Sequence, residues 1–136
     1  AKNHPLAGNG PVPLREIGNY PLIIREEGSG TRKTVLSALQ SMNVSPLSLI
    51  EAKSTEFIKE WASQGKGVSV VVKRAVSDDD LKSLCLVPFQ EPLSMEVSVC
   101  FLKTRKNDRA IQRFMDHVKE LRENPPFKGP SSVGST

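Results

Sequence analysis

Pro21-Leu-Ile-Ile-Arg-Glu-Glu-Gly-Ser-Gly-Thr-Arg32 is the stretch that decides the fold of this 136-residue chain. Its apolar run is too short for a helix and fits a strand buried on both faces. Gly28 and Gly30 then permit a tight turn and a close approach to a ligand. Behind them, apolar residues recur at helical spacing, at Val35, Ala38, Leu39 and Met42. The stretch therefore predicts a strand, a glycine-hydroxyl loop and a helix.

Such a junction gathers hydrogen-bond donors at one point. Backbone N–H groups, the hydroxyls of Ser29 and Thr31, and the positive end of a helix dipole all meet there, and together they suit an anion or a carboxylate. An alternative is that the hydroxyls only cap the helix. A nucleotide P-loop is disfavoured, because Lys33-Thr34 lacks the glycine that precedes the lysine in that motif.

The composition is that of an ordinary globular protein. Lys and Arg exceed Asp and Glu by 19 to 15, which gives a modest net charge of +4 and no nucleic-acid signature by itself. No apolar run approaches the roughly 18 residues of a membrane span, and no signal peptide is expected. Cys85 and Cys100 lie in apolar runs without metal-ligand spacing, so they are predicted to be buried, reduced core thiols of a cytoplasmic protein.

The order of the predicted elements indicates an α/β fold. A second strand is expected over 47–52, a helix from Thr55 with Ser54 or Thr55 as its cap, and a third strand over 68–72. This alternation predicts a mainly parallel sheet flanked by helices. Further strands are expected over 84–88 and 95–101, followed by a last helix capped by Asn107 or Asp108. Its apolar face is Ile111, Phe114, Met115, Val118 and Leu121.

In this order the segments resemble the effector-binding domain of LysR-type bacterial transcriptional regulators, a periplasmic-binding-protein type 2-like fold. The resemblance runs from His4-Pro-Leu-Ala7 through Gly28-Ser-Gly-Thr-Arg32 to Gly65-x-Gly-Val-x-Val-Val-Val72, Leu86-Val-Pro88 and the helix with Phe114. Together with the Gly- and Pro-rich composition of the two ends, which predicts the arm and the tail, it divides the chain into four parts. These are a connecting arm (1–20), the second lobe of an effector-binding domain (21–102), a helix that returns toward the first lobe (103–122), and a disordered tail (123–136).

The resemblance also implies a function. The chain is expected to sense a small, anionic effector and to be no enzyme, with no metal or other cofactor. DNA would be bound only through a helix-turn-helix domain that this chain lacks, no membrane would be bound, and a homo-oligomer is expected. An alternative with the same fold is the solute-binding protein of an ABC transporter for an oxyanion or small carboxylate.

The expected ligand-binding residues are Ser29, Gly30, Thr31 and Lys73. Lys73 marks a departure from the family, whose members usually carry a proline after this strand, so its charge would face the cleft or the solvent. Catalytic residues are not expected, because His4 lies in a loose arm and His117 is predicted on the polar side of the last helix. Glu26 and Glu27 are interpreted as charged residues at a strand end rather than as a general base.

Overall fold

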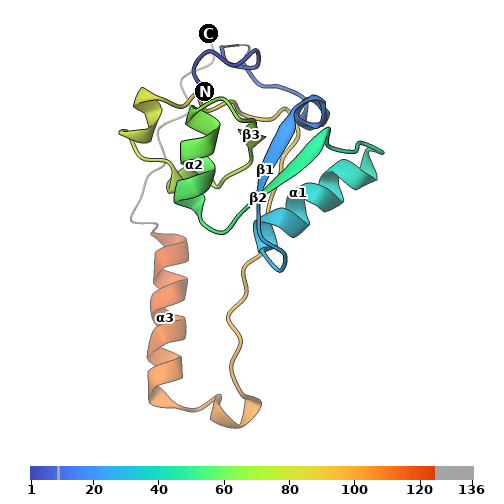
Figure 1. The fold of residues 1–136 in the computed structure, drawn as a ribbon. Helices are drawn as coiled ribbons and strands as arrows, with labels where there is room; N and C mark the ends of the chain where they lie inside the picture. The colour runs from blue at the N-terminus through green and yellow to red at the C-terminus, as the bar shows by residue number, and fades with distance from the viewer. Residues whose placement is uncertain (9, 125–136) are drawn as a thin grey trace. The chain divides into compact units, whose positions relative to one another are not determined.

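The computed structural model describes residues 1–8 and 10–124 (Figure 1). The chain divides into two compact units, Ala1–Glu96 and the part from Val97 onward. From position 125, the predicted disordered tail lies outside the described residues. The boundaries predicted for the arm, the lobe and the return helix stay predictions.

The first unit is built on a three-stranded parallel sheet, which confirms the predicted fold class. β1 (Pro21–Arg25) lies in the centre, with β2 (Ser48–Ala52) on one side and β3 (Val68–Ser69) on the other. β1 pairs with all of β2, whereas only two of its residues pair with β3. The order β2-β1-β3 requires helical crossovers, and α1 (Gly30–Ser41) and α2 (Thr55–Ser63) supply them.

The alternation of side chains along β1 sends apolar residues to both faces of the sheet. Leu22 and Ile24 pack against the α1 side, in one cluster with Leu39. Ile23 packs on the opposite face with Ile58 of α2. Figure 1 shows the two helices on either side of the strands. Burial on both faces explains why β1 is a continuous apolar run rather than an alternating one.

Local chemistry sets where the crossover elements begin and end. Ser54 caps α2, because its hydroxyl accepts a hydrogen bond from the Phe57 amide at 3.2 Å. After α1, Asn43 takes a left-handed conformation with φ 55°. At the start of β3, a Cβ on Gly67 would lie 2.3 Å from the Pro21 carbonyl oxygen, so only glycine allows β3 to approach β1 this closely.

Short 3₁₀ helices and one long helix complete the described chain. In the first unit, the 3₁₀ helices are Leu14–Asn19, Lys73–Ala75 and Asp80–Lys82. The second unit contains the 3₁₀ helix Lys103–Arg105 and α3 (Arg109–Glu123). Asp108 caps α3 as predicted, with its carboxylate accepting a hydrogen bond from the Ala110 amide at 2.9 Å.

Three strand predictions need correction. The third strand is paired only at Val68–Ser69, and the segments 84–88 and 95–101 form no strand. Directly after the segment 84–88, Phe89 forms a single bridge with Val12. In the segment 95–101, the alternating apolar side chains are between 41% and 80% exposed. Both sequences have strand-like composition, but a strand also needs a continuous run of hydrogen bonds to a neighbour. Among the described residues, the first segment pairs with a neighbour only through the bonds around the Val12–Phe89 bridge, and no backbone pairing is formed by 95–101.

The prediction that the two cysteines are buried was wrong. Cys85 and Cys100 are free thiols, but both are exposed. Each lies in one of the two segments that form no strand, so neither thiol is carried into a core.

Candidate ligand-binding site

The loop between β1 and α1 has the geometry that its glycines predict. Gly28 is left-handed with φ 89°, and the Ser29 amide donates to the Glu26 carbonyl oxygen at 3.2 Å, which closes the turn. Ser29 is the N-cap residue of α1, yet its side chain makes no capping hydrogen bond. The capping interpretation of the Ser29 hydroxyl is therefore not supported.

Arg32 ties the first turn of α1 to the carboxyl ends of two strands. Its Nη1 atom donates to the Arg25 carbonyl oxygen at the end of β1 and to the Glu51 carboxylate on β2, both at 2.9 Å. Its side chain is 22% exposed. Because both bonds are made by one guanidinium, they fix the first turn of α1 relative to the sheet. They also pair the charge of Arg32, the cation nearest to Thr31 in sequence.

A pocket of about 580 Å³ opens beside the start of α1. One wall is α1 itself, with Thr31 and Thr34 at positions i and i+3 of one helix face. The other walls are the chain after β3 and two later segments. They contribute Val70, Val71, Val72, Lys73, Leu86, Val87, Pro88, Phe89, Leu93, Ser94 and Met95. The walls are thus mostly apolar, and their polar side chains are Thr31 and Thr34 on α1, Lys73 and Ser94.

The pocket has one charged lining residue among those described, and it is positive. Lys73 lies in the 3₁₀ helix that follows β3 and is exposed at the pocket edge. No carboxylate lines the pocket within the described part of the chain. A lysine, two threonine hydroxyls and the positive end of a helix dipole together favour an anionic group.

The structure brings two of the four predicted site residues to one pocket. Thr31 and Lys73 both line it, although 42 positions separate them (73 minus 31). Ser29 and Gly30 lie at the loop but do not line the pocket, and a Cβ on Gly30 would lie 3.0 Å from Met95 Sδ. The sequence reasoning missed Thr34 and Ser94. Thr34 could have been found, because it lies one helical turn after Thr31.

Other chemistry is poorly supported by the described residues. Glu26 is hydrogen-bonded by Arg25 at 2.7 Å, and this bond, together with a backbone bond, lowers its pKa to about 2. So acidic a carboxyl group is a weak base at neutral pH. His4 stacks edge-on against Tyr20, and His117 lies exposed on α3. No cluster of metal-ligating side chains occurs in residues 1–8 and 10–124.

The same residues contain no membrane-spanning element of the helical kind. Each described helix is too short or too polar to cross a lipid bilayer.

Comparison with solved structures identifies proteins that share this fold. The chain is similar to the Synechocystis PCC6803 CcmR regulatory domain, solved in complex with 2-PG, with a TM-score of 0.72 and 26% identity over 93% of this chain and 62% of that one. HinK, a LysR family regulator from Pseudomonas aeruginosa, shares the fold with a TM-score of 0.73. It is 23% identical, over 88% of this chain and 42% of HinK.

Comparison with curated proteins gives the same family. A transcriptional regulator of Methanocaldococcus jannaschii is 33% identical over 125 residues, which are 88% of this chain and 42% of that protein. The chain spans 25% to 42% of the length of the first curated relatives that it matches. These relatives are transcriptional regulators, which favours a regulator over the transporter alternative.

A family model supplies the remaining evidence. The model described as the LysR substrate binding domain matches residues 1–123, which include the whole sheet, both crossover helices and the pocket beside α1. This chain therefore belongs to the LysR substrate-binding domain family.

Proposed function

We propose that the chain senses a small molecule that carries one anionic group on an apolar body. The single observation that carries this proposal is the pocket beside α1, where Thr31, Thr34 and Lys73 converge against apolar walls. The relative CcmR was solved with 2-PG, so a small-molecule ligand is in keeping with the family.

The distribution of charge around the pocket supports a single anionic group. Arg32 and Arg25 are already engaged by Glu51 and Glu26, which leaves Lys73 as the cation that lines the pocket within the described residues. A second negative charge on the ligand would have no such partner. The apolar walls favour a ligand with a hydrocarbon or aromatic body, because burying apolar surface stabilises the complex by roughly 25 cal/mol per Å².

The remaining parts of the function are proposals at the level of the whole regulator. Ligand binding alters how a separate helix-turn-helix domain binds DNA. The protein acts in the cytoplasm as a homo-oligomer, and it has no enzymatic activity. The relatives support this proposal, since they are transcriptional regulators and this chain matches only part of their length.

The test is calorimetry on the protein at the length that its gene encodes, with acetate, benzoate, methanesulfonate and sulfate as probes. Benzoate is expected to bind more tightly than acetate or sulfate. Thr31→Val keeps the shape of the side chain and removes one hydroxyl, so benzoate affinity should fall by roughly tenfold. Lys73→Met should lower it at least as much, because it removes the lining cation.

Ser37→Ala is the matched control, because Ser37 lies exposed on α1 and does not line the pocket. It should leave benzoate binding unchanged. Equal affinity in the parent, Thr31→Val and Lys73→Met would contradict this site, and stronger binding of sulfate than of benzoate would contradict the apolar body.

A further inference from the structure

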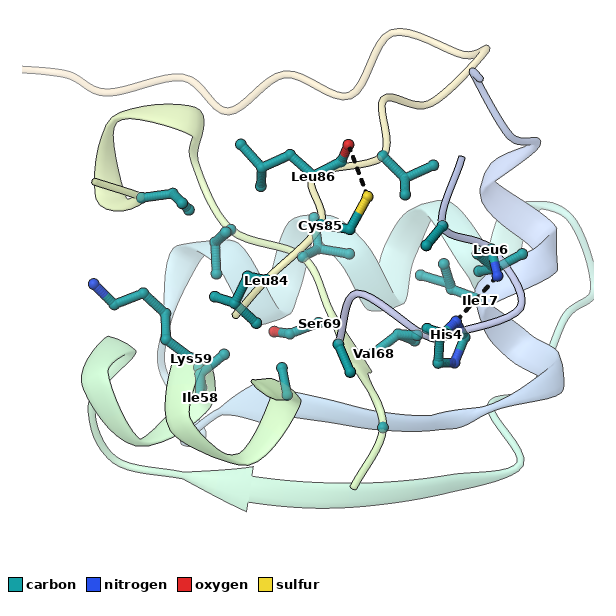
Figure 2. A pocket seen from close by; sticks show the side chains of 18 of the residues that line it. His4, Leu6, Ile17, Ile58, Lys59, Val68, Ser69, Leu84, Cys85 and Leu86 are labelled. Atoms are coloured by element: carbon teal, nitrogen blue, oxygen red, sulfur yellow. Dashed lines mark hydrogen bonds between the residues drawn. The ribbon is translucent and has the colours of Figure 1, made fainter. Parts of the chain in front are cut away.

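A second cavity lies in the first unit, along the free edge of β3. It has a volume of about 150 Å³ and separates β3 from the segment 84–87, with α2 and the N-terminal arm closing its sides. Figure 2 shows the side chains of these four parts of the chain directed toward one another. Thr31, Thr34 and Lys73 do not line this cavity, so its polar groups differ from those of the pocket beside α1. The two are neighbours, because both are lined by Val70, Val71, Leu86, Val87 and Phe89.

The lining of this β3-edge cavity is almost wholly apolar. Ile17, Ile58, Val68, Leu84, Leu86 and Phe89 contribute most of the large side chains. The charged neighbour is already engaged, because Lys59 Nζ bonds Asp80 at 2.8 Å and the Ala75 carbonyl oxygen at 3.2 Å. His4 Nδ1 accepts from the Leu6 amide at 3.2 Å, and burial lowers the pKa of His4, which favours its neutral form. Neither the Lys59 ammonium nor the His4 imidazole therefore offers a free charge to an ionic ligand.

Ser69 supplies the one observation that apolar packing does not explain. Its hydroxyl oxygen is buried in the cavity lining and has no hydrogen-bond partner among the described residues. In Figure 2 it lies between Ile58 of α2 and Leu84 of the facing segment. A buried hydroxyl without a partner is costly, so a molecule that bonds it would be favoured.

A single water that bonds Ser69 would find no second unpartnered buried side-chain atom among the described residues. Buried waters typically make about three hydrogen bonds to protein groups, and the unpartnered side-chain oxygen here is one. An apolar cavity of about this volume holds a benzene ring in another protein.

We propose that the β3-edge cavity binds a small uncharged molecule with an apolar body of about the size of a benzene ring and one polar group, which hydrogen-bonds to the Ser69 hydroxyl. This ligand is of a different chemical class from the anion proposed for the pocket beside α1. The two proposals rest on different polar groups, Ser69 here and Thr31, Thr34 and Lys73 in the pocket beside α1, although the two cavities share apolar walls.

Cys85 provides a readout, because its thiol is exposed and lines the cavity. The experiment uses the protein at the length that its gene encodes. The rate of Cys85 alkylation by iodoacetamide is measured by mass spectrometry at increasing concentrations of phenol, toluene or benzoate. Phenol and toluene are expected to slow the alkylation of Cys85, with benzoate much weaker. Cys100, which is exposed in the second unit, is the internal control and should react at an unchanged rate.

Ser69→Ala tests the hydrogen bond, and it should fold because it only removes an unpartnered hydroxyl. The phenol concentration for half-protection should rise about five- to tenfold, while that for toluene stays the same. Ser63→Ala is the matched control, since the Ser63 hydroxyl bonds the Glu60 carbonyl oxygen at the surface of α2. Thr31→Val should not change protection, which separates this result from the fate of the anion site.

Two outcomes would overturn the proposal. If no probe protects Cys85 at saturating concentration, the cavity holds only water or closes. If phenol protects the parent and Ser69→Ala equally, Ser69 recognises no ligand.

Discussion

α1 and α3 carry similar apolar patterns but meet different surroundings. α1 buries Val35 and Leu39, each only 1% exposed, against β1 of the same unit. α3 has the more regular apolar face, yet none of its residues is buried and Phe114 remains 54% exposed. An amphipathic pattern therefore indicates that a helix needs a partner, and it does not indicate that the partner lies in the same stretch of chain.

The largest expected effect comes from one substitution made in both helices. Leu39→Ala should lower the free energy of unfolding by about 2–5 kcal/mol, because it empties a packed position. Leu121→Ala, at a residue 39% exposed on α3, should cost less than about 1 kcal/mol. Urea denaturation, followed by far-UV circular dichroism and by the fluorescence of the sole tryptophan, checks both. Equal costs would mean that α3 is packed as α1 is, and the comparison would fail.

The caps of the two helices give a smaller, second contrast. Asp108→Ala removes the side-chain bond to the Ala110 amide and should destabilise α3 by about 1 kcal/mol, seen as lost helical signal on mild heating. Ser29→Ala should change α1 by only a few tenths of a kcal/mol, because Ser29 makes no capping bond. A comparable loss in both variants would restore the capping role of Ser29.

Acid should produce the smallest effect, through Asp80 in the first unit. Hydrogen bonds from Lys59 and Ser77 lower the pKa of Asp80 from its ordinary 3.8 to about 2. Since the folded pKa is the lower one, this stabilisation is present above about pH 3.8 and is lost as the pH falls through about 2.

Asp80→Asn should therefore flatten the fall in thermal midpoint between pH 5 and pH 2, measured by tryptophan fluorescence. The effect stays below that of the α3 cap, because ion pairs near the surface are screened by solvent. Curves that coincide for Asp80→Asn and the parent would show that the Lys59–Asp80 pair is not part of the acid response.

Much of the fold could be predicted where the partners of an element are close in sequence. β1, α1, β2 and α2 follow one another, and each packs against its neighbours, so local patterns were enough. The segments 84–88 and 95–101 carry equally good strand patterns, but pairing depends on non-local neighbours that composition does not reveal. The exposure of Cys85 and Cys100 follows from that same gap.

The candidate site was predictable in part for a related reason. Thr31 could be found from the loop and helix pattern, whereas Lys73 was placed through the family resemblance and its departure from it. Ser94 and Met95 line the pocket from a segment without regular structure. No periodic sequence pattern predicts the position of such a segment. Ser29 illustrates the opposite case, because a loop hydroxyl can lie next to a pocket without lining it.

The close approach at Gly67 also bears on how this domain can diversify. Gly67 locks β3 against Pro21, where any side chain would collide with backbone. Six residues later, Lys73 stands exposed at the edge of the pocket beside α1. The residue that cannot vary and the residue proposed to meet the ligand are thus separate positions on one short segment. If Lys73 binds the ligand as proposed, descendants of this sequence can exchange its charge, and with it the molecules they respond to, while they inherit the sheet unchanged.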